Sequence, residues 1–110
     1  MEPPNLAEEV SSLHAELCSA LADPTRIMLI YALSEKPCNV GELAIQVGVS
    51  QPTASRHLKI LRDRGLVRPT RLGPNVEYSL IDHRLVEALD LLRAILRDRI
   101  VYRASIMESE

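Results

Sequence analysis

Apolar residues recur at helical spacing through the middle of this chain. Ala54, Leu58 and Leu61 lie at i, i+4 and i+7, which places them on one face of a 3.6-residue period. Ser50 is a favoured N-cap residue in front of this run, and Gly65 suits the left-handed residue that follows a helix end. The pattern therefore predicts an amphipathic helix that starts after Ser50 and ends before Gly65.

A second short helix is predicted directly before this one, from Val40 to Val47. Gly48 can close that helix in a left-handed conformation, so that only Gly48, Val49 and Ser50 join the two helices. Two helices joined by such a tight turn form a helix-turn-helix, which we expect over about residues 40–65.

Two strand-like runs follow the helix-turn-helix. Val76, Tyr78 and Leu80 alternate with polar residues, as expected of a strand with one buried and one wet face. A Gly-Pro-Asn turn at residues 73–75 separates this run from the one before it. We therefore expect a β-hairpin, placed as a wing beside the preceding helix, over about residues 66–80.

Both ends of the chain are also predicted to be helical. An apolar stripe predicts a first helix over about residues 6–21, and a second helix runs from Pro24, capped by Asp23, to about Ser34. The stripe consists of Leu6, Val10, Leu13, Leu17 and Leu21. The last helix, over about residues 82–101, starts at a capping aspartate, Asp82, and carries apolar residues around more than one face.

That surplus of apolar residues points to a second partner, because a stripe about 100° wide is enough to dock a helix on its own core. The simplest partner is the same helix of a second copy, flanked by the first helix. A last helix buried entirely in its own core would show the same pattern. The expected fold class is mainly α with a small β-hairpin wing, a winged helix-turn-helix that forms a homodimer through its first and last helices.

The length of 110 residues fits one domain, residues 1–110, with no room for a second, catalytic domain. The chain has no apolar run of about 18 residues and no basic start followed by an apolar stretch. Neither a membrane span nor a secretory signal is therefore expected, and the predicted location is the cytoplasm, with no membrane partner.

Charge is distributed unevenly along the chain. The segment 51–71 contains six cations and one anion, a local charge of +5, whereas the whole chain carries −2 and the remainder therefore −7. Local charge governs encounter at short range, because salt screens charges beyond about 10 Å at about 0.1 M. The basic segment suits a nucleic acid, although a charged run alone is often only the solvated face of a surface helix.

The outer face of the predicted helix and the wing offer groups that hydrogen-bond to bases or pair with phosphates. The candidate DNA-binding residues are Gln51, Thr53, Ser55, Arg56, His57, Lys59, Arg71 and Asn75. Lys59 and Arg71 are expected on phosphates, and Arg71 and Asn75 lie on the wing, which can reach the backbone or the minor groove. His57 is next to the apolar Leu58, so a satisfied core histidine is the alternative for it.

Three features together resemble the ArsR/SmtB family of winged-helix repressors: ALADPTR at residues 20–26, SQPTASRHLKILRDRGLV at 50–67, and the wing. The resemblance covers roughly residues 17–96 and implies a homodimeric bacterial or archaeal repressor that releases its operator when an inducer binds. Two wings related by a two-fold axis imply a pseudo-palindromic operator with half-sites about 34–36 Å apart. The expected partners are double-stranded operator DNA and a second copy of the chain.

The resemblance also implies two places where family members bind metals, and neither is complete here. The stretch that holds cysteines in metal-sensing members corresponds to Glu42–Gln46, which has none. At the last helix Asp82 and Asp98 are kept, but Arg84 and Ile95 stand where histidine ligands are expected. Zinc and related metals need thiolate or imidazole donors, so no metal-binding residue is predicted.

Cys18 and Cys38 are the only thiols and the candidate inducer-sensing residues. They would react with an oxidant, a persulfide or another sulfur species, or bind a thiophilic metalloid such as trivalent arsenic. Two thiols fall short of a three-thiolate arsenic site, so sulfur or redox sensing ranks first and no cofactor is expected. Either residue could instead be a small core hydrophobe. A helix about 16 Å long separates the two, which argues against an intrachain disulfide.

Two further classes of function bear on the same residues. A winged helix can serve as a protein-interaction module, and its basic stripe would then bind an acidic partner. An enzyme is not expected, because the sequence contains no Gly-rich phosphate loop and no Gly-x-Ser-x-Gly elbow.

Overall fold

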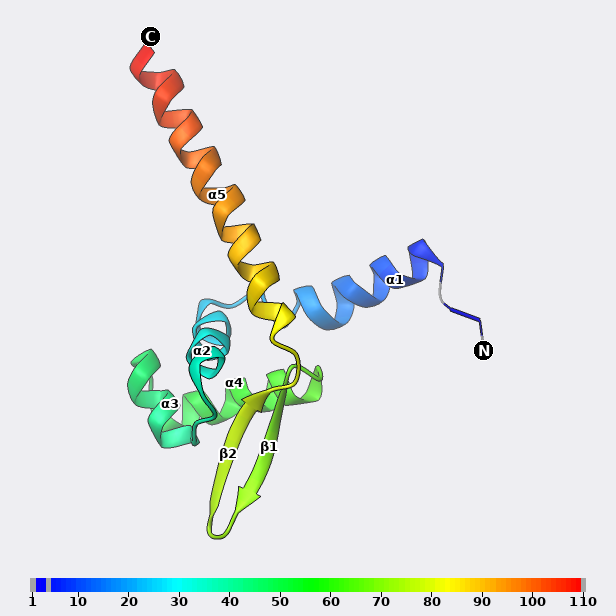
Figure 1. Ribbon diagram of the computed structural model, residues 1–110, viewed down its shortest axis with the longest axis vertical. Helices are drawn as coiled ribbons and strands as arrows, with labels where there is room; N and C mark the ends of the chain where they lie inside the picture. Colours follow the sequence, from blue (N-terminus) through cyan, green and yellow to red (C-terminus); the bar gives the residue numbers. More distant parts are fainter. Residues whose placement is uncertain (1, 4, 110) are drawn as a thin grey trace.

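The computed structural model describes residues 2–3 and 5–109, which form a cluster of short helices, a projecting β-hairpin and two helices that extend away (Figure 1). In chain order the elements are α1 (Leu6–Ser12), the π-helical turn η1 (Leu13–Cys18), α2 (Pro24–Glu35), α3 (Val40–Val47), α4 (Gln51–Asp63), β1 (Val67–Leu72), β2 (Asn75–Leu80) and α5 (Arg84–Ser109). The predicted winged helix-turn-helix, mainly α with one small hairpin, is confirmed.

The core lies where α2, α3 and α4 meet the base of the hairpin. Leu29 and Leu33 from α2, Leu43 from α3, and Leu58 and Leu61 from α4 are almost completely buried there. Burial of each such leucine stabilises the fold by roughly 1.5–3 kcal/mol. The inner face of α4 is therefore fixed by packing, and its outer face is left for contacts with other molecules.

The helix-turn-helix begins and ends as the sequence predicts. Asn39 and Glu42 form a capping box at the start of α3, each side chain accepting from the backbone N–H of the other. Gly48 ends α3 with a φ of 78°, in the left-handed region that favours glycine. The Ser50 hydroxyl accepts from the Thr53 N–H at 3.2 Å and starts α4. A short turn therefore sets the angle between the two helices.

The hairpin lies within the predicted range and is more exposed than the sequence predicts. Its antiparallel strands start from Val67 opposite Leu80. The turn is the two-residue pair Gly73–Pro74, and Asn75 already belongs to β2. A φ of 63° at the glycine makes such a short turn possible. The predicted burial of Val76 is wrong, since this side chain is 38% exposed, because the core covers only the base of the hairpin.

One residue outside the hairpin extends its ladder. The N–H of Cys38, in the loop between α2 and α3, donates to the Tyr78 carbonyl at 3.1 Å, and the Tyr78 N–H donates back at 2.7 Å. The pairing attaches β2 to the helix-turn-helix through the backbone. The wing is thereby held in a fixed orientation beside α4.

The first helix departs from its predicted range. It is a regular α-helix only as far as Ser12, continues as the π-helical η1 and ends at Cys18 rather than near residue 21. The apolar residues of α1 pack on no described element other than η1, so that Leu6 is 76% and Val10 is 53% exposed. The chain turns back into the core at Ala20, which is 1% exposed.

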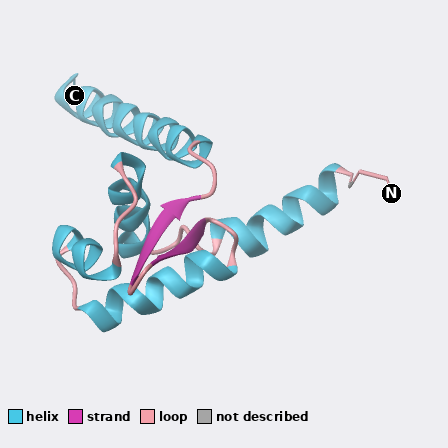
Figure 2. Ribbon diagram, turned by 60° about the horizontal axis from the view of Figure 1, so that its bottom comes forward, coloured by secondary structure: helices cyan, strands magenta, loops and turns pink. Residues whose placement is uncertain are grey.

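The last helix also differs from its predicted range. It begins at Arg84 and runs to Ser109, later at both ends than expected. Only its first turns pack on the core, through Leu85, Val86 and Leu89. The two ends of the chain leave the body on opposite sides (Figure 2). The radius of gyration is accordingly 17.2 Å, whereas a compact domain of this length has about 13 Å.

Candidate nucleic-acid interface

The outer face of α4 carries a row of exposed polar and cationic side chains. The exposed residues of this row are Gln51, Ser55, Arg56, Lys59 and Arg62. The buried face of the same helix is apolar, so these side chains can meet a partner without disturbing the core. With thirteen residues, α4 is about 20 Å long at about 1.5 Å per residue. A helix of this kind fits the major groove of B-DNA, which is about 12 Å wide.

Thr53 lies at the edge of this row and is half-buried. Its Oγ1 accepts from the Ser50 hydroxyl at 2.8 Å, within the cap that starts α4. The Thr53 hydroxyl keeps its own proton for donation, so a hydrogen bond to a phosphate or a base acceptor stays open to it.

His57 does not belong to the outer face. It is 7% exposed, and its Nδ1 lies 3.1 Å from Nη1 of Arg26 in α2. This burial and contact favour the alternative of a satisfied core histidine over a contact between His57 and DNA. The physical reason is helical geometry, because His57 lies three residues after Ala54 and four before Leu61, both fully buried.

The wing residues Arg71 and Asn75 are both exposed near the tip of the hairpin. Arg71 is opposite Val76 and Asn75 is opposite Leu72. Because opposed residues share a face and successive residues alternate, Arg71 and Asn75 point to opposite faces of the hairpin. Both residues can contact the same duplex only if the hairpin tip enters a DNA groove, with one DNA backbone on each side of the tip.

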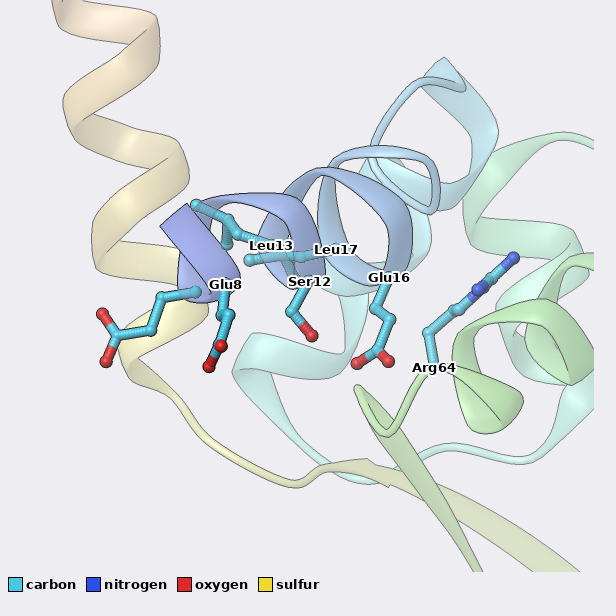
Figure 3. A pocket seen from close by; sticks show the side chains of 7 residues that line it. Glu8, Ser12, Leu13, Glu16, Leu17 and Arg64 are labelled. Carbon is cyan, nitrogen blue, oxygen red and sulfur yellow. The ribbon is translucent and has the colours of Figure 1, made fainter. Parts of the chain in front are cut away.

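An acidic cleft marks the edge of the basic surface. It has a volume of about 460 Å³ and lies between the first helix and Arg64, at the end of α4. Glu8 and Glu16 direct their carboxylates to the same side of the first helix as the Ser12 hydroxyl (Figure 3). Carboxylates repel phosphates, so we expect a DNA footprint to stop at this side of α4.

Cys18 and Cys38 lie in different environments. Cys18 is exposed and borders a hollow of about 270 Å³ between the end of η1 and α5, where Leu92 and Leu96 form part of the wall. Cys38 is 0% exposed and belongs to the core. The burial of Cys38 does not favour the expectation that it senses an inducer, because its sulfur atom is enclosed by the folded chain. Cys18 is not the core hydrophobe considered above.

Asp82 and Arg84 form a salt bridge with each other. Nη2 of Arg84 lies 2.7 Å from the Asp82 carboxylate, which also accepts from the Arg84 N–H at 2.9 Å. The side-chain hydrogen bond from Arg84, followed by its backbone N–H, lowers the pKa of Asp82 to about 2. Within residues 2–3 and 5–109 no group of three or more His, Cys, Asp or Glu side chains is arranged to hold a metal ion.

Arg26 is a residue to which the sequence assigned no function. It lies in the first turn of α2, and its guanidinium contacts the imidazole of His57 in α4. Its neighbour Asp23 caps the same turn. Although burial raises the pKa of Asp23, the N–H bonds from Arg26 and Thr25 and the nearby charges outweigh it and hold this pKa below its usual value. The only sequence signal for this arrangement is the ALADPTR motif itself.

Comparisons with known proteins identify the family. The profile described as "Bacterial regulatory protein, arsR family" matches residues 23–68. The HTH-type transcriptional regulator CmtR of Mycobacterium tuberculosis (strain H37Rv) is 42% identical over 83 residues, which cover 74% of this chain and 70% of CmtR. The chain belongs to the ArsR/SmtB family of transcriptional repressors. Membership in this family confirms a DNA-binding function. The matched relatives are transcriptional regulators, which agrees with the expectation that the protein is no enzyme.

Solved structures of similar proteins share the family fold. The crystal structure of Rv0081 from M. tuberculosis has a TM-score of 0.77 and 31% identity, and covers 94% of this chain and 99% of its own. The transcriptional repressor BigR of Xylella fastidiosa has a TM-score of 0.71 and 34% identity, with 81% and 91% covered. In the described part of this ArsR/SmtB-family chain, no helix is long and apolar enough to cross a membrane.

Proposed function

We propose that this chain is a homodimeric cytoplasmic repressor that holds a pseudo-palindromic operator through α4 and the wing and releases it when Cys18 reacts. The observation that carries the DNA-binding part is the division of α4 into two faces. Leu58 and Leu61 are 0% exposed on one face, whereas the adjoining Lys59 and Arg62 are exposed on the other. The outer face combines hydrogen-bonding groups for bases with cations for phosphates.

The apolar surface of α5 supports the homodimer. At about 100° per residue, Leu91 and Ile95 lie about 160° and about 120° around the helix from the core-facing Leu89. They are 67% and 56% exposed, so the protomer's own core does not cover them. Ile100, further along the same helix, is 60% exposed. Exposed apolar residues around more than one face of a helix are typical of an interface, and a second α5 with the first helix beside it would cover them.

The DNA-binding proposal is tested by competition. Fluorescence anisotropy would compare a duplex from immediately upstream of the protein's own gene with a random duplex at one salt concentration. A repressor should prefer its operator by about 10³-fold or more. Equal affinity for both duplexes would favour the alternative of a protein-interaction module. Sedimentation of the Ile95→Glu variant tests the dimer: we expect monomers, with the wild type dimeric.

Inducer sensing is assigned to Cys18 because its thiol is exposed, whereas that of Cys38 is buried. Cys18 also lies at the end of the first helix, beside the proposed dimer face. With an organic polysulfide, the Cys18 thiolate attacks one sulfur atom, forms a new S–S bond and releases the remainder as a thiolate or hydropersulfide. A metal or metalloid inducer is the second candidate, because the relative CmtR has been solved as a cadmium metal-sensor. Its weakness here is that the thiols lie apart, one exposed and one in the core.

The two candidates make different predictions. Polysulfide treatment of the reduced protein should release the operator, and a thiol reductant should restore binding. The Cys18→Ser variant should bind the operator and ignore the treatment, whereas Cys38→Ala serves as a control that keeps the response. Release by cadmium or trivalent arsenic, with no response to polysulfide, would replace thiol chemistry at Cys18 by metal binding.

A further inference from the structure

The Arg26 side chain, which lies in α2, contacts two other segments: the chain directly after η1, and α4. Its Nε donates to the Ala20 carbonyl at 2.6 Å and its Nη2 to the Ser19 carbonyl at 3.2 Å. Its Nη1 lies 3.1 Å from Nδ1 of His57 in the middle of α4. One planar guanidinium therefore connects the end of the first helix, the start of α2 and the DNA-facing helix.

The contact with His57 defines the state of the imidazole ring. A guanidinium has only donors, so Nδ1 of His57 must accept and the ring proton belongs on Nε2. The ring is buried beside the apolar stripe of α4, at 7% exposure. A hydrogen bond of this geometry restrains the ring, and it adds a polar link between α2 and α4 to the packing of Leu58 and Leu61.

The remaining nitrogen atoms of the Arg26 guanidinium donate to the carbonyl groups of Ser19 and Ala20. They follow directly after η1, where a helix end leaves carbonyls without intrahelical partners. Arg26 donates to both, the Ser19 carbonyl also accepts from the Ala22 N–H at 3.3 Å, and Ala20 itself is buried at 1% exposure. The end of the first helix, next to Cys18, is thereby held to the same side chain that holds α4.

We propose that Arg26 and His57 are positioning residues for operator recognition: Arg26 sets the rotation of α4 relative to the first helix without touching DNA. The inference rests on the proposed DNA-binding function. A rotation of about 10° moves an atom about 5 Å from the helix axis by about 0.9 Å. This exceeds the range of about 0.5 Å within which N–H···O bonds form, so a loss of the link should reduce base recognition more than phosphate contact.

The experiment measures the ratio of operator to random-duplex affinity, using an operator selected from random DNA by the wild-type protein. Arg26→Gln and His57→Leu should each lower this ratio by about tenfold, and the double variant should lower it no further, a coupling within the range for contacting residues. His57→Asn keeps an acceptor oxygen near the Nδ1 position and should recover most of the ratio. The salt dependence of binding should stay as in the wild type, because no phosphate contact is removed.

A spectroscopic measurement separates positioning from a general loss of structure. A long-range ¹H–¹⁵N spectrum should show the His57 ring protonated on Nε2, with an Nδ1 shift that changes in Arg26→Gln. If Arg26→Gln does not fold, the pair His57→Leu and His57→Asn carries the same test.

Three results would contradict the positioning role or the function on which it rests. An operator preference that stays unchanged in Arg26→Gln, or additive losses in the double variant, would overturn the positioning role. A salt dependence that weakens by about one phosphate per protomer would make Arg26 a direct DNA contact instead. If the wild-type protein itself selects no operator, the proposed function fails together with this inference.

Discussion

Replacement of Lys59 by glutamine tests the assignment of the α4 outer face to DNA most directly. Lys59 is exposed and follows the buried Leu58, so the substitution removes a charge without opening the core. No described residue forms a hydrogen bond or ion pair with its ammonium group. We therefore expect the free energy of unfolding to stay unchanged and the whole effect to appear in DNA binding.

The expected size follows from the number of phosphate contacts. In a dimer two lysines are lost, and each contact contributes about 0.9 to the slope of log K against log salt, so the slope should weaken by about 1.8. Between about 50 mM and about 200 mM salt, this difference makes the wild type lose about 12-fold more affinity than the variant. Preference for the operator over random duplex should persist, because phosphate contacts carry no sequence information.

The assay is fluorescence anisotropy at four or more salt concentrations, with operator and random duplexes. Arg97→Gln is the matched control, since it removes an exposed cation from α5, which extends to the side of the body away from the wing (Figure 1). An unchanged slope in Lys59→Gln would refute the phosphate contact. An equal change in Arg97→Gln would show that net charge, rather than the position of Lys59, controls binding.

Three further predictions concern the core, the thiols and pH. Leu58→Ala should cost about 2–5 kcal/mol of the free energy of unfolding in urea, because this side chain is 0% exposed, and a cost below about 1 kcal/mol would contradict the packing. In native protein iodoacetamide should label Cys18 and spare Cys38, as mass spectrometry would detect, whereas both should react in urea. Because the folded-state pKa of Asp82 is about 2 against an ordinary 3.8, its carboxylate stabilises the fold above pH 3.8, and this contribution disappears as the pH falls towards 2. Asp82→Asn should therefore flatten that part of the curve of stability against pH, by a small amount because Asp82 is exposed; a curve identical to that of the wild type would contradict the Arg84 pairing.

The sequence predicted the helix-turn-helix closely and the two outer helices less well. Asn39, Gly48 and Ser50 specify helix ends through contacts within a few residues, so their effect is legible in the chain itself. The first helix has no such signal at its end. Its apolar stripe predicted a helix to residue 21, but the helix ends at Cys18 and only turns continue to residue 21, with Ala20 buried in the core.

The candidate site divides in the same way. The outward position of Arg56 and Lys59 follows from the period of α4, and the sequence placed both correctly. The same period places His57 beside the buried Ala54 and Leu61. Its partner in the folded chain, Arg26, lies 31 positions earlier, and no local pattern indicates that contact.

The sequence by itself determined the elements, their order and the family, because periodicity, caps and turn residues act over a few positions. Only the tertiary structure decided which side chains are accessible. It buried Cys38 by pairing the backbone of that residue with Tyr78, left Cys18 exposed, and joined Arg26 to His57. Those outcomes depend on segments that meet only when the chain folds, and no local pattern encodes which distant residue will cover a given side chain.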